Sequence, residues 1–139
     1  MSDELSGVIA LTFYKDQSGN LTTATPVDLP ITSGPYHKGF VMPQNGCLRA
    51  VIARCETTPN TANPDLVCSM TLDGTESTDG HADIAIGETE KEATFKNGEV
   101  TIAKGAEVGA SIMQTGGTID AAVDEVVILL LVQLGKSNI

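Results

Sequence analysis

Residues 40–51 read FVMPQNGCLRAV, in which a proline, an asparagine and a glycine stand between two apolar runs. Proline fixes its own φ, and asparagine and glycine adopt backbone angles that other residues avoid, so this order is typical of a sharp change of chain direction. The segment that follows, CLRAVIARC (47–55), has the apolar content of a strand. Pro43, Asn45 and Gly46 therefore predict a sheet corner between two β-strands.

The rhythm of strand and turn continues along the rest of the chain. Residues 66–72, LVCSMTL, alternate with the period of a half-buried strand. The polar run DGTESTDG (73–80) predicts a loop, and Asn97-Gly98 predicts a tight hairpin turn between EATF and EVTIA. About eight or nine short strands with regularly spaced turns indicate an all-β chain, a single-domain, jelly-roll-like antiparallel β-sandwich.

The last apolar segment, DEVVILLLVQL (124–134), is apolar on both faces at its centre. A helix competes here because residues 129–131 are three leucines, but the paired valines, the neighbouring glycines and the all-β context favour a strand. A strand of this kind is either central and covered on both sides, or covered on its second face by another subunit. The sequence leaves both explanations open.

Residues 1–38 differ from the remainder and predict an N-terminal arm or outer hairpin, with the sandwich domain over residues 39–139. GVIALTFY (7–14) is β-branched and aromatic, the Thr-rich LTTATP (21–26) follows a turn-rich stretch, and three prolines punctuate residues 26–38. The arm is expected to contact a shell or a neighbouring subunit. Pairing within the domain's own sheet is the alternative.

Charge excludes several classes of partner. The 139 residues carry 18 acids against 8 bases, for a net charge of −10. Phosphate backbones are bound mainly through Lys and Arg, so nucleic acid and anionic membrane are not expected partners. The acids that crowd residues 73–92 are expected to form a solvated face.

The cysteines and the start of the chain point to a reducing compartment. Cys47, Cys55 and Cys68 are an odd number without a C-x-x-C pair, which favours buried thiols over disulfides. Cys47 and Cys55 are expected on one face of a single strand, too far apart to bridge. The acidic start, Met1-Ser2-Asp3-Glu4, leads us to expect no secretory leader, and the longest apolar run, 126–132, is too short to span a bilayer.

Reactive side chains are scarce, and no catalytic, cofactor-binding or metal-binding residue is predicted. The sequence contains no nucleotide-binding glycine loop, no G-x-S-x-G and no H-E-x-x-H. Its only histidines are His37 and His81. Asp79, His81 and Asp83 could share a strand face and bind a divalent cation, but their spacing is not that of a calcium loop, and a polar surface is the preferred interpretation. No cofactor is expected.

Three stretches resemble the small jelly-roll proteins of tailed bacteriophage virions, namely head decoration (cement) proteins and related fibre modules. They are GFVMPQNGCLRAVIA (39–53), FKNGEVTIAKGAEVGASIM (95–113) and VVILLLVQL (126–134). The resemblance implies a homotrimer that clamps neighbouring capsid subunits, with the major capsid protein as partner. It also implies a place on the outer capsid surface of the virion after synthesis in the host cytoplasm. Lys104-Gly105 departs from the more frequent Gly-Asp.

Two function classes follow from this resemblance. The first is a non-enzymatic capsid decoration protein; the alternative is a fibre or receptor-binding module that recognises a host glycan or protein. For the first, the expected interface residues are apolar side chains of the arm and of the last strand: Ile9, Leu11, Phe13, Tyr14, Leu29, Ile31, Tyr36, Val127, Leu129 and Leu131.

Overall fold

All regular structure in the described part of the chain is β, as predicted. The computed structural model describes residues 7–15, 27–32, 39–56, 65–85, 87–114 and 125–135. Their strands are β1 (Gly7–Lys15), β2 (Val27–Leu29), β3 (Phe40–Val41), β4 (Gly46–Cys55), β5 (Leu66–Leu72), β6 (Thr75–Ile84), β7 (Glu90–Thr94), β8 (Thr101–Ile102), β9 (Glu107–Gln114) and β10 (Val126–Leu134). Within these residues no helix is long and apolar enough to cross a membrane.

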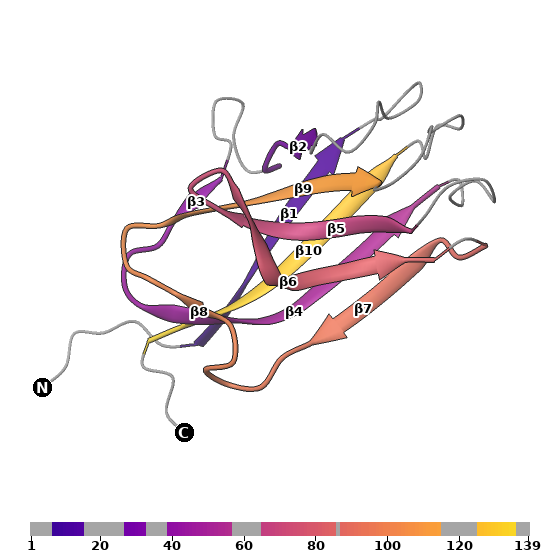
Figure 1. Cartoon of the computed structure of the whole chain (residues 1–139). Coiled ribbons are helices and arrows are strands. Elements are labelled where there is room, and N and C mark those ends of the chain that lie inside the picture. Colours follow the sequence, from indigo (N-terminus) through magenta and orange to yellow (C-terminus); the bar gives the residue numbers. More distant parts are fainter. Residues whose placement is uncertain are drawn as a thin grey trace, which may run out of the picture.

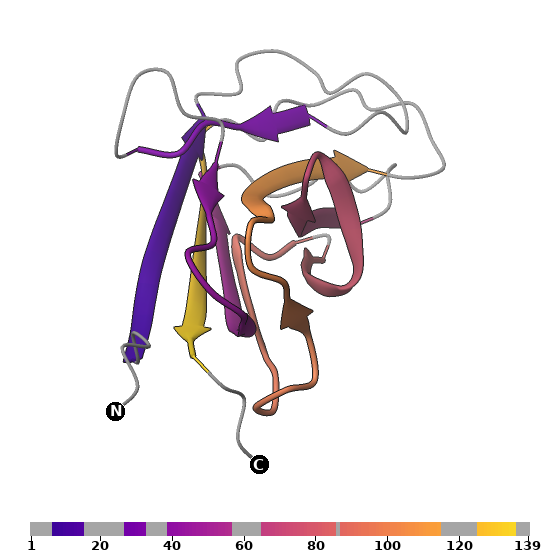
Figure 2. The same ribbon diagram turned by 90° about the vertical axis from the view of Figure 1, so that its left-hand side faces the viewer.

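The strands form two antiparallel sheets packed face to face (Figures 1 and 2). Sheet A has the order β1-β10-β4-β7, with β8 following β7 along the same edge of β4. Sheet B has the order β2-β9-β5-β6, with β3 following β2 along β9. Of the connections, only β2–β3, β5–β6 and β7–β8 stay within one sheet, which is the wrapping of a jelly roll. The predicted fold class is confirmed.

Strand β10 is the centre of sheet A, and the strand prediction for it is confirmed. It pairs with β1 over nine residues on one side and with β4 on the other. Alternate residues from Val126 to Leu134 are buried in the core, whereas Val127, Leu129 and Leu131 are half-buried on the outer face. One apolar face of β10 therefore packs in the core of the sandwich, whereas the other lies on the outside of sheet A.

Segments of the predicted arm belong to this same sandwich. Strand β1 is an edge of sheet A and β2 pairs with β9 in sheet B. A bridge between Phe13 and Ile31 and a hydrogen bond from Tyr14 N to Pro30 O (3.1 Å) tie the two together. Residues 7–15 and 27–29 thus pair within the domain's own sheets, which was the alternative to an arm that contacts another subunit. The predicted hairpin segment 21–26 lies outside the described residues.

The corner at residues 42–46 carries the chain from sheet B to sheet A. Met42 donates its N–H to Ala106 O (2.9 Å) and accepts from Gly105 N (2.8 Å). Asn45 Oδ1 accepts from Lys104 N (2.8 Å), and Asn45 O accepts from Gly135 N (3.0 Å). The predicted corner is confirmed, and it joins the β8–β9 turn to the end of β10.

Gly46 is needed in this corner because the chain approaches itself closely there. Its backbone lies outside the left-handed region that the Asn-Gly pattern favours. A Cβ at this position would overlap the backbone O of Gln133 and come within 2.8 Å of Met42 Cε. Glycine is therefore needed here because it leaves room for the neighbouring strand β10, and not because the turn requires a left-handed backbone.

Two other turns differ from the sequence prediction. Asp73 (φ 52°) and Gly74 (φ 86°) form a two-residue hairpin that pairs Leu72 with Thr75, so the loop predicted for 73–80 is wrong and most of it is strand β6. At Asn97-Gly98 the turn is present, with Gly98 at φ 85°, but β7 and β8 pair with β4 and not with each other. The predicted hairpin there is wrong.

We predict that Gly46→Ala destabilises the fold by at least about 2 kcal/mol, because the added methyl group displaces backbone that cannot relax independently. The matched control is Gly74→Ala, where positive φ costs about 1 kcal/mol but the Cβ meets nothing within 4 Å. Urea unfolding of the three proteins measures the difference. A smaller loss for Gly46→Ala than for Gly74→Ala would contradict this account of the corner.

Candidate functional site

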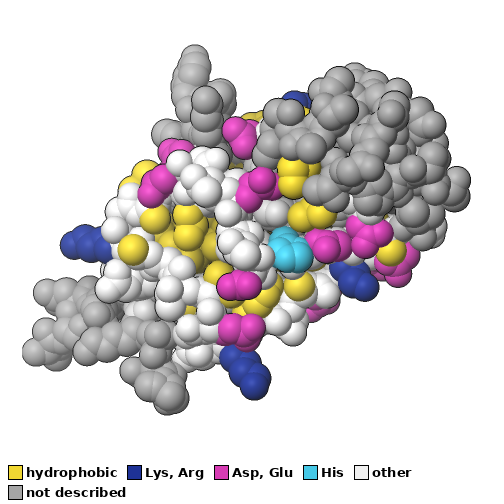
Figure 3. Space-filling view, in the orientation of Figure 1, with side chains coloured by type: hydrophobic (Ala, Val, Ile, Leu, Met, Phe, Trp, Pro, Cys, Tyr) yellow, Lys and Arg dark blue, Asp and Glu magenta, His cyan; other side chains and the backbone are white. Residues whose placement is uncertain are grey.

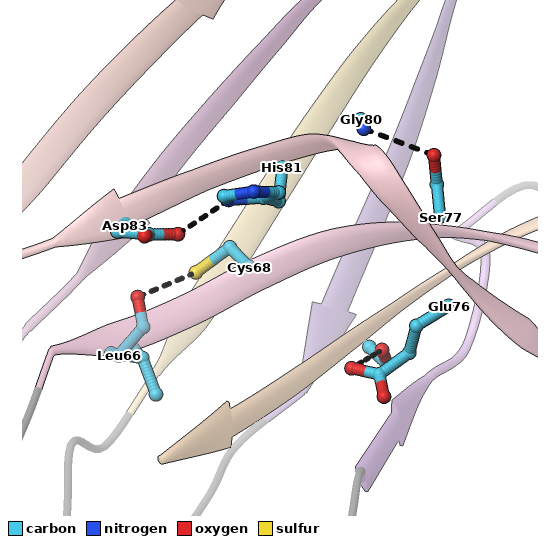
Figure 4. Close-up of polar contacts among 8 residues, drawn as sticks. Leu66, Cys68, Glu76, Ser77, Gly80, His81 and Asp83 are labelled. Atoms are coloured by element: carbon cyan, nitrogen blue, oxygen red, sulfur yellow. Dashed lines mark hydrogen bonds and ion pairs between the residues drawn. The ribbon is translucent and has the colours of Figure 1, made fainter. Parts of the chain in front are cut away.

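The histidine predicted as a weak metal candidate forms a polar pair on the outer face of sheet B. His81 Nδ1 lies 2.7 Å from Asp83 Oδ1, and both side chains are partly exposed (Figure 4). Asp79 lies in the irregular stretch of β6 where Gly80 N donates to Ser77 Oγ (2.9 Å). Among the residues that the structure describes, no three His, Cys, Asp or Glu side chains are placed to hold a metal ion. His37 lies outside the described residues.

The three cysteines are free and buried. Cys68 is a core thiol, as predicted, and Cys55 is also in the core. Cys47 lies on the opposite face, where its Sγ contacts Asn97 Oδ1 (3.3 Å). A β-bulge near Arg49 interrupts the pairing of β4 with β10 and shifts the alternation of side chains along β4. The prediction that Cys47 and Cys55 share one face is therefore wrong.

Burial makes the two core thiols unreactive. Removal from water raises the pKa of the Cys55 thiol to about 11, because the thiolate loses its hydration. The pKa of Cys68 is raised further, chiefly by burial and in addition by the nearby Cys55 and Asp83. Neither side chain has the low pKa and exposure of a nucleophilic cysteine.

The outer face of sheet A is apolar at its centre and charged at one margin. Strand register places Leu129 beside Ile52 and Thr12, and Leu131 beside Ala50 and Ala10. Toward β7 the charges are paired, with Arg54 bonded to Glu90 (3.0 Å). The apolar centre thus runs along β10 and its neighbours, without a charged side chain among these residues.

The predicted interface residues separate into three groups. Leu11, Phe13, Leu29 and Ile31 are buried in the core between the sheets, and Ile9 packs against it. Val127, Leu129 and Leu131 are half-buried on the outer face of sheet A, and Tyr14 is exposed beside them, with its hydroxyl 3.3 Å from Glu125 Oε1. Tyr36 lies outside the described residues. The outer-face group is the one available to a second molecule.

The outer face of sheet B mixes hydroxyl, apolar and acidic side chains. Buried Ser69, Thr71 and Ser111 lie beside the half-buried pair Val67 and Met113. Figure 3 shows hydrophobic and acidic side chains on this face, with the Lys and Arg side chains toward its margins. A hollow of about 250 Å³ opens at one end, lined by Asp28, Thr71, Asp73, Gly74, Glu107, Gly109 and Ala110. Sequence analysis missed this group because its members come from three distant segments, and the Asp-Gly turn at 73–74 was the only local signal.

Comparison with known proteins identifies the fold. No protein-family model and no curated protein matches the sequence. Among solved structures, the chain is similar to one from the "Cyanophage Pam1 capsid asymmetric unit", with a TM-score of 0.56 and 12% sequence identity. The similarity covers 98% of this chain and 89% of that chain. At this identity it shows a shared fold, and function has to be argued from the surfaces.

We predict that the free energy of unfolding falls as pH rises from about 9 towards 11, with a slope of up to about 1.4 kcal/mol per unit for each core thiol. The unfolded chain releases these protons at the ordinary pKa, whereas the folded chain retains them until the raised pKa is passed. Urea unfolding across this range measures the slope. Because Lys and Tyr also titrate there, the decisive comparison is with Cys55→Ala and Cys68→Ala, and slopes equal to that of the unsubstituted chain would contradict it.

Proposed function

We propose that the protein is a non-enzymatic structural component of a bacteriophage virion, a capsid decoration (cement) protein that clamps neighbouring capsid subunits as a homotrimer. The observation that carries the proposal is the fold similarity, over 98% of the chain, to a chain of a phage capsid assembly. The scarcity of reactive groups on the described surface is consistent with a protein whose work is contact.

The outer face of sheet A is the proposed subunit interface. Its centre offers Leu129, Leu131 and Ile52, which are half-buried in the single chain. Burying such a side chain at an interface stabilises association by about 1.5–3 kcal/mol when it is fully exposed beforehand, and by less here. Apolar centres with charged margins are the usual anatomy of oligomer interfaces.

Charge supports association through this face in particular. A chain with a net charge of −10 repels a second copy, so contact is favoured where charges are absent or already paired. On sheet A the flanking charges include the Arg54–Glu90 ion pair, whereas the outer face of sheet B carries Asp28, Glu76 and Asp83. Sheet B is then left to face the solvent or the capsid shell, on the outer surface of the virion.

The proposal is tested by adding purified protein to expanded heads of the phage that encodes it. These heads come from a mutant phage that lacks the gene for the protein. We expect saturable binding at regular sites in electron cryomicroscopy and increased resistance of the heads to heat. Absence of binding to heads, together with inhibition of phage adsorption to host cells, would instead favour the fibre or receptor-binding alternative.

We also predict that Leu129→Lys weakens self-association, raising the subunit dissociation constant by at least about tenfold, because an ammonium group would be buried without a partner. Val67→Lys is the matched control, since Val67 is a half-buried apolar residue on the outer face of sheet B. Analytical ultracentrifugation measures both. Equal association in the two variants, or a monomeric unsubstituted protein, would exclude this interface.

A further inference from the structure

The hollow on sheet B gathers three carboxylates that form no ion pair with a basic side chain among the described residues. Asp28 comes from β2, Asp73 from the β5–β6 turn, and Glu107 from the start of β9. None of the three takes part in the ion pairs Arg54–Glu90 and His81–Asp83, which are found elsewhere in the described ranges. Like charges held in one concave site repel one another, so a cation that enters relieves this repulsion.

A buried hydroxyl at the floor of the hollow supplies an independent sign of a ligand. Thr71 is only 5% exposed, and strand alternation puts its side chain on the outer face because Met70 lies in the core. It makes no side-chain hydrogen bond with any residue that the structure describes. A buried hydroxyl without a partner costs about 1–3 kcal/mol, which a bound donor would offset.

The space beside Thr71 exists because the residue opposite it has no side chain. The register of β5 and β9 pairs Thr71 with Gly109, so the residue beside Thr71 on β9 contributes no side chain to the outer face. Asp28, which pairs with Ser111 one step further along β9, borders the same space. The hydroxyl therefore faces the hollow between two strands.

One of the three carboxylates is held in position by the backbone. Asp73 N donates to Glu107 O (2.9 Å), and Glu107 N donates to Asp73 Oδ1 (2.9 Å). This reciprocal pair fixes the Asp-Gly turn against the start of β9, and it leaves the second oxygen of Asp73 to accept from a ligand. A pre-ordered acceptor loses little conformational entropy on binding.

We propose that this hollow receives an arginine side chain of a partner protein. A bare metal ion is disfavoured because the carboxylates are not arranged around one point, whereas calcium requires its oxygen ligands at about 2.3–2.6 Å. A guanidinium spreads five donors over a planar fork and reaches several separated acceptors. At about 250 Å³ the hollow is smaller than the clefts that usually hold drug-sized ligands.

This inference goes beyond the proposed virion role and does not depend on it. It assigns a contact to sheet B, whereas self-association is assigned to sheet A. A chain that failed to bind capsids would still be expected to bind arginine here, and a trimer without arginine binding would leave the capsid proposal standing.

The test is a titration of the isotope-labelled full chain with N-acetyl-arginine amide, followed by nuclear magnetic resonance. We expect saturable shifts of the backbone amide signals of Thr71, Gly74 and Gly109. The citrulline analogue, which has the same shape without the charge, is expected to produce no such shifts. Spermine and calcium chloride, titrated in parallel, are expected to cause only small unsaturated changes at these signals.

Substitutions locate the effect. Asp28→Asn and Glu107→Gln are each expected to weaken arginine binding about two- to fivefold, and Thr71→Val is expected to weaken binding without lowering the melting temperature. Glu92→Gln on β7, which also removes one negative charge, is the matched control and is expected to leave affinity unchanged.

Three results would overturn the proposal. The first is equal binding of arginine and citrulline analogues, or of calcium at the same signals with higher affinity. The second is equal weakening by Glu92→Gln and Asp28→Asn, which would indicate attraction to the acidic surface as a whole. The third is unchanged affinity in Thr71→Val, because the hydroxyl is what distinguishes this hollow from an acidic patch.

Discussion

The packing of the two sheets depends on how the chain crosses between them at residues 42–46. Residues in such a crossing belong to neither sheet, so their backbone N–H and C=O groups need hydrogen-bond partners outside the ladders. Here Met42 and Asn45 bond to the β8–β9 turn and to the residue after β10, so one short segment fixes two others. The close approach at Gly46 then sets where β10 lies beside β4. The central apolar strand, the core and both outer faces follow from that placement.

Much of this architecture could be predicted because alternation is a local property. The side chains of β5 and β10 point to opposite faces in turn, and a reader of the sequence sees this pattern directly. Pairing is not local. The same Asn-Gly dipeptide closes a turn at 97–98 without a hairpin, while Asp73-Gly74, taken for part of a loop, makes one. A turn dipeptide indicates only which backbone angles are allowed at that position. Which strands then pair depends on packing in the whole sheet. The bulge near Arg49 is likewise invisible in the sequence, and it reverses the face of Cys47.

The candidate surfaces differ in how far sequence could find them. Val127, Leu129 and Leu131 were accessible to prediction because an apolar outer face remains visible once a strand is recognised. Leu11 and Phe13 showed the same apolar character but lie in the core, since their face depends on the register of β1 with β10. The hollow on sheet B was beyond reach, because it forms from a missing side chain at Gly109 beside Thr71, and these residues meet only through strand pairing.

The jelly roll makes the two outer faces chemically independent. The core lies between the sheets, so a residue that points outward from sheet A shares no packing neighbour with one that points outward from sheet B. Evolution can therefore vary one face for self-association and the other for a partner without a common cost in stability. The described charges follow this division. At the margin of sheet A, Arg54 forms an ion pair with Glu90. On the outer face of sheet B, the acidic side chains Asp28, Glu76 and Asp83 accompany His81. An acidic chain that associates through its neutral face presents its charge on the other, where a basic partner is the complementary surface.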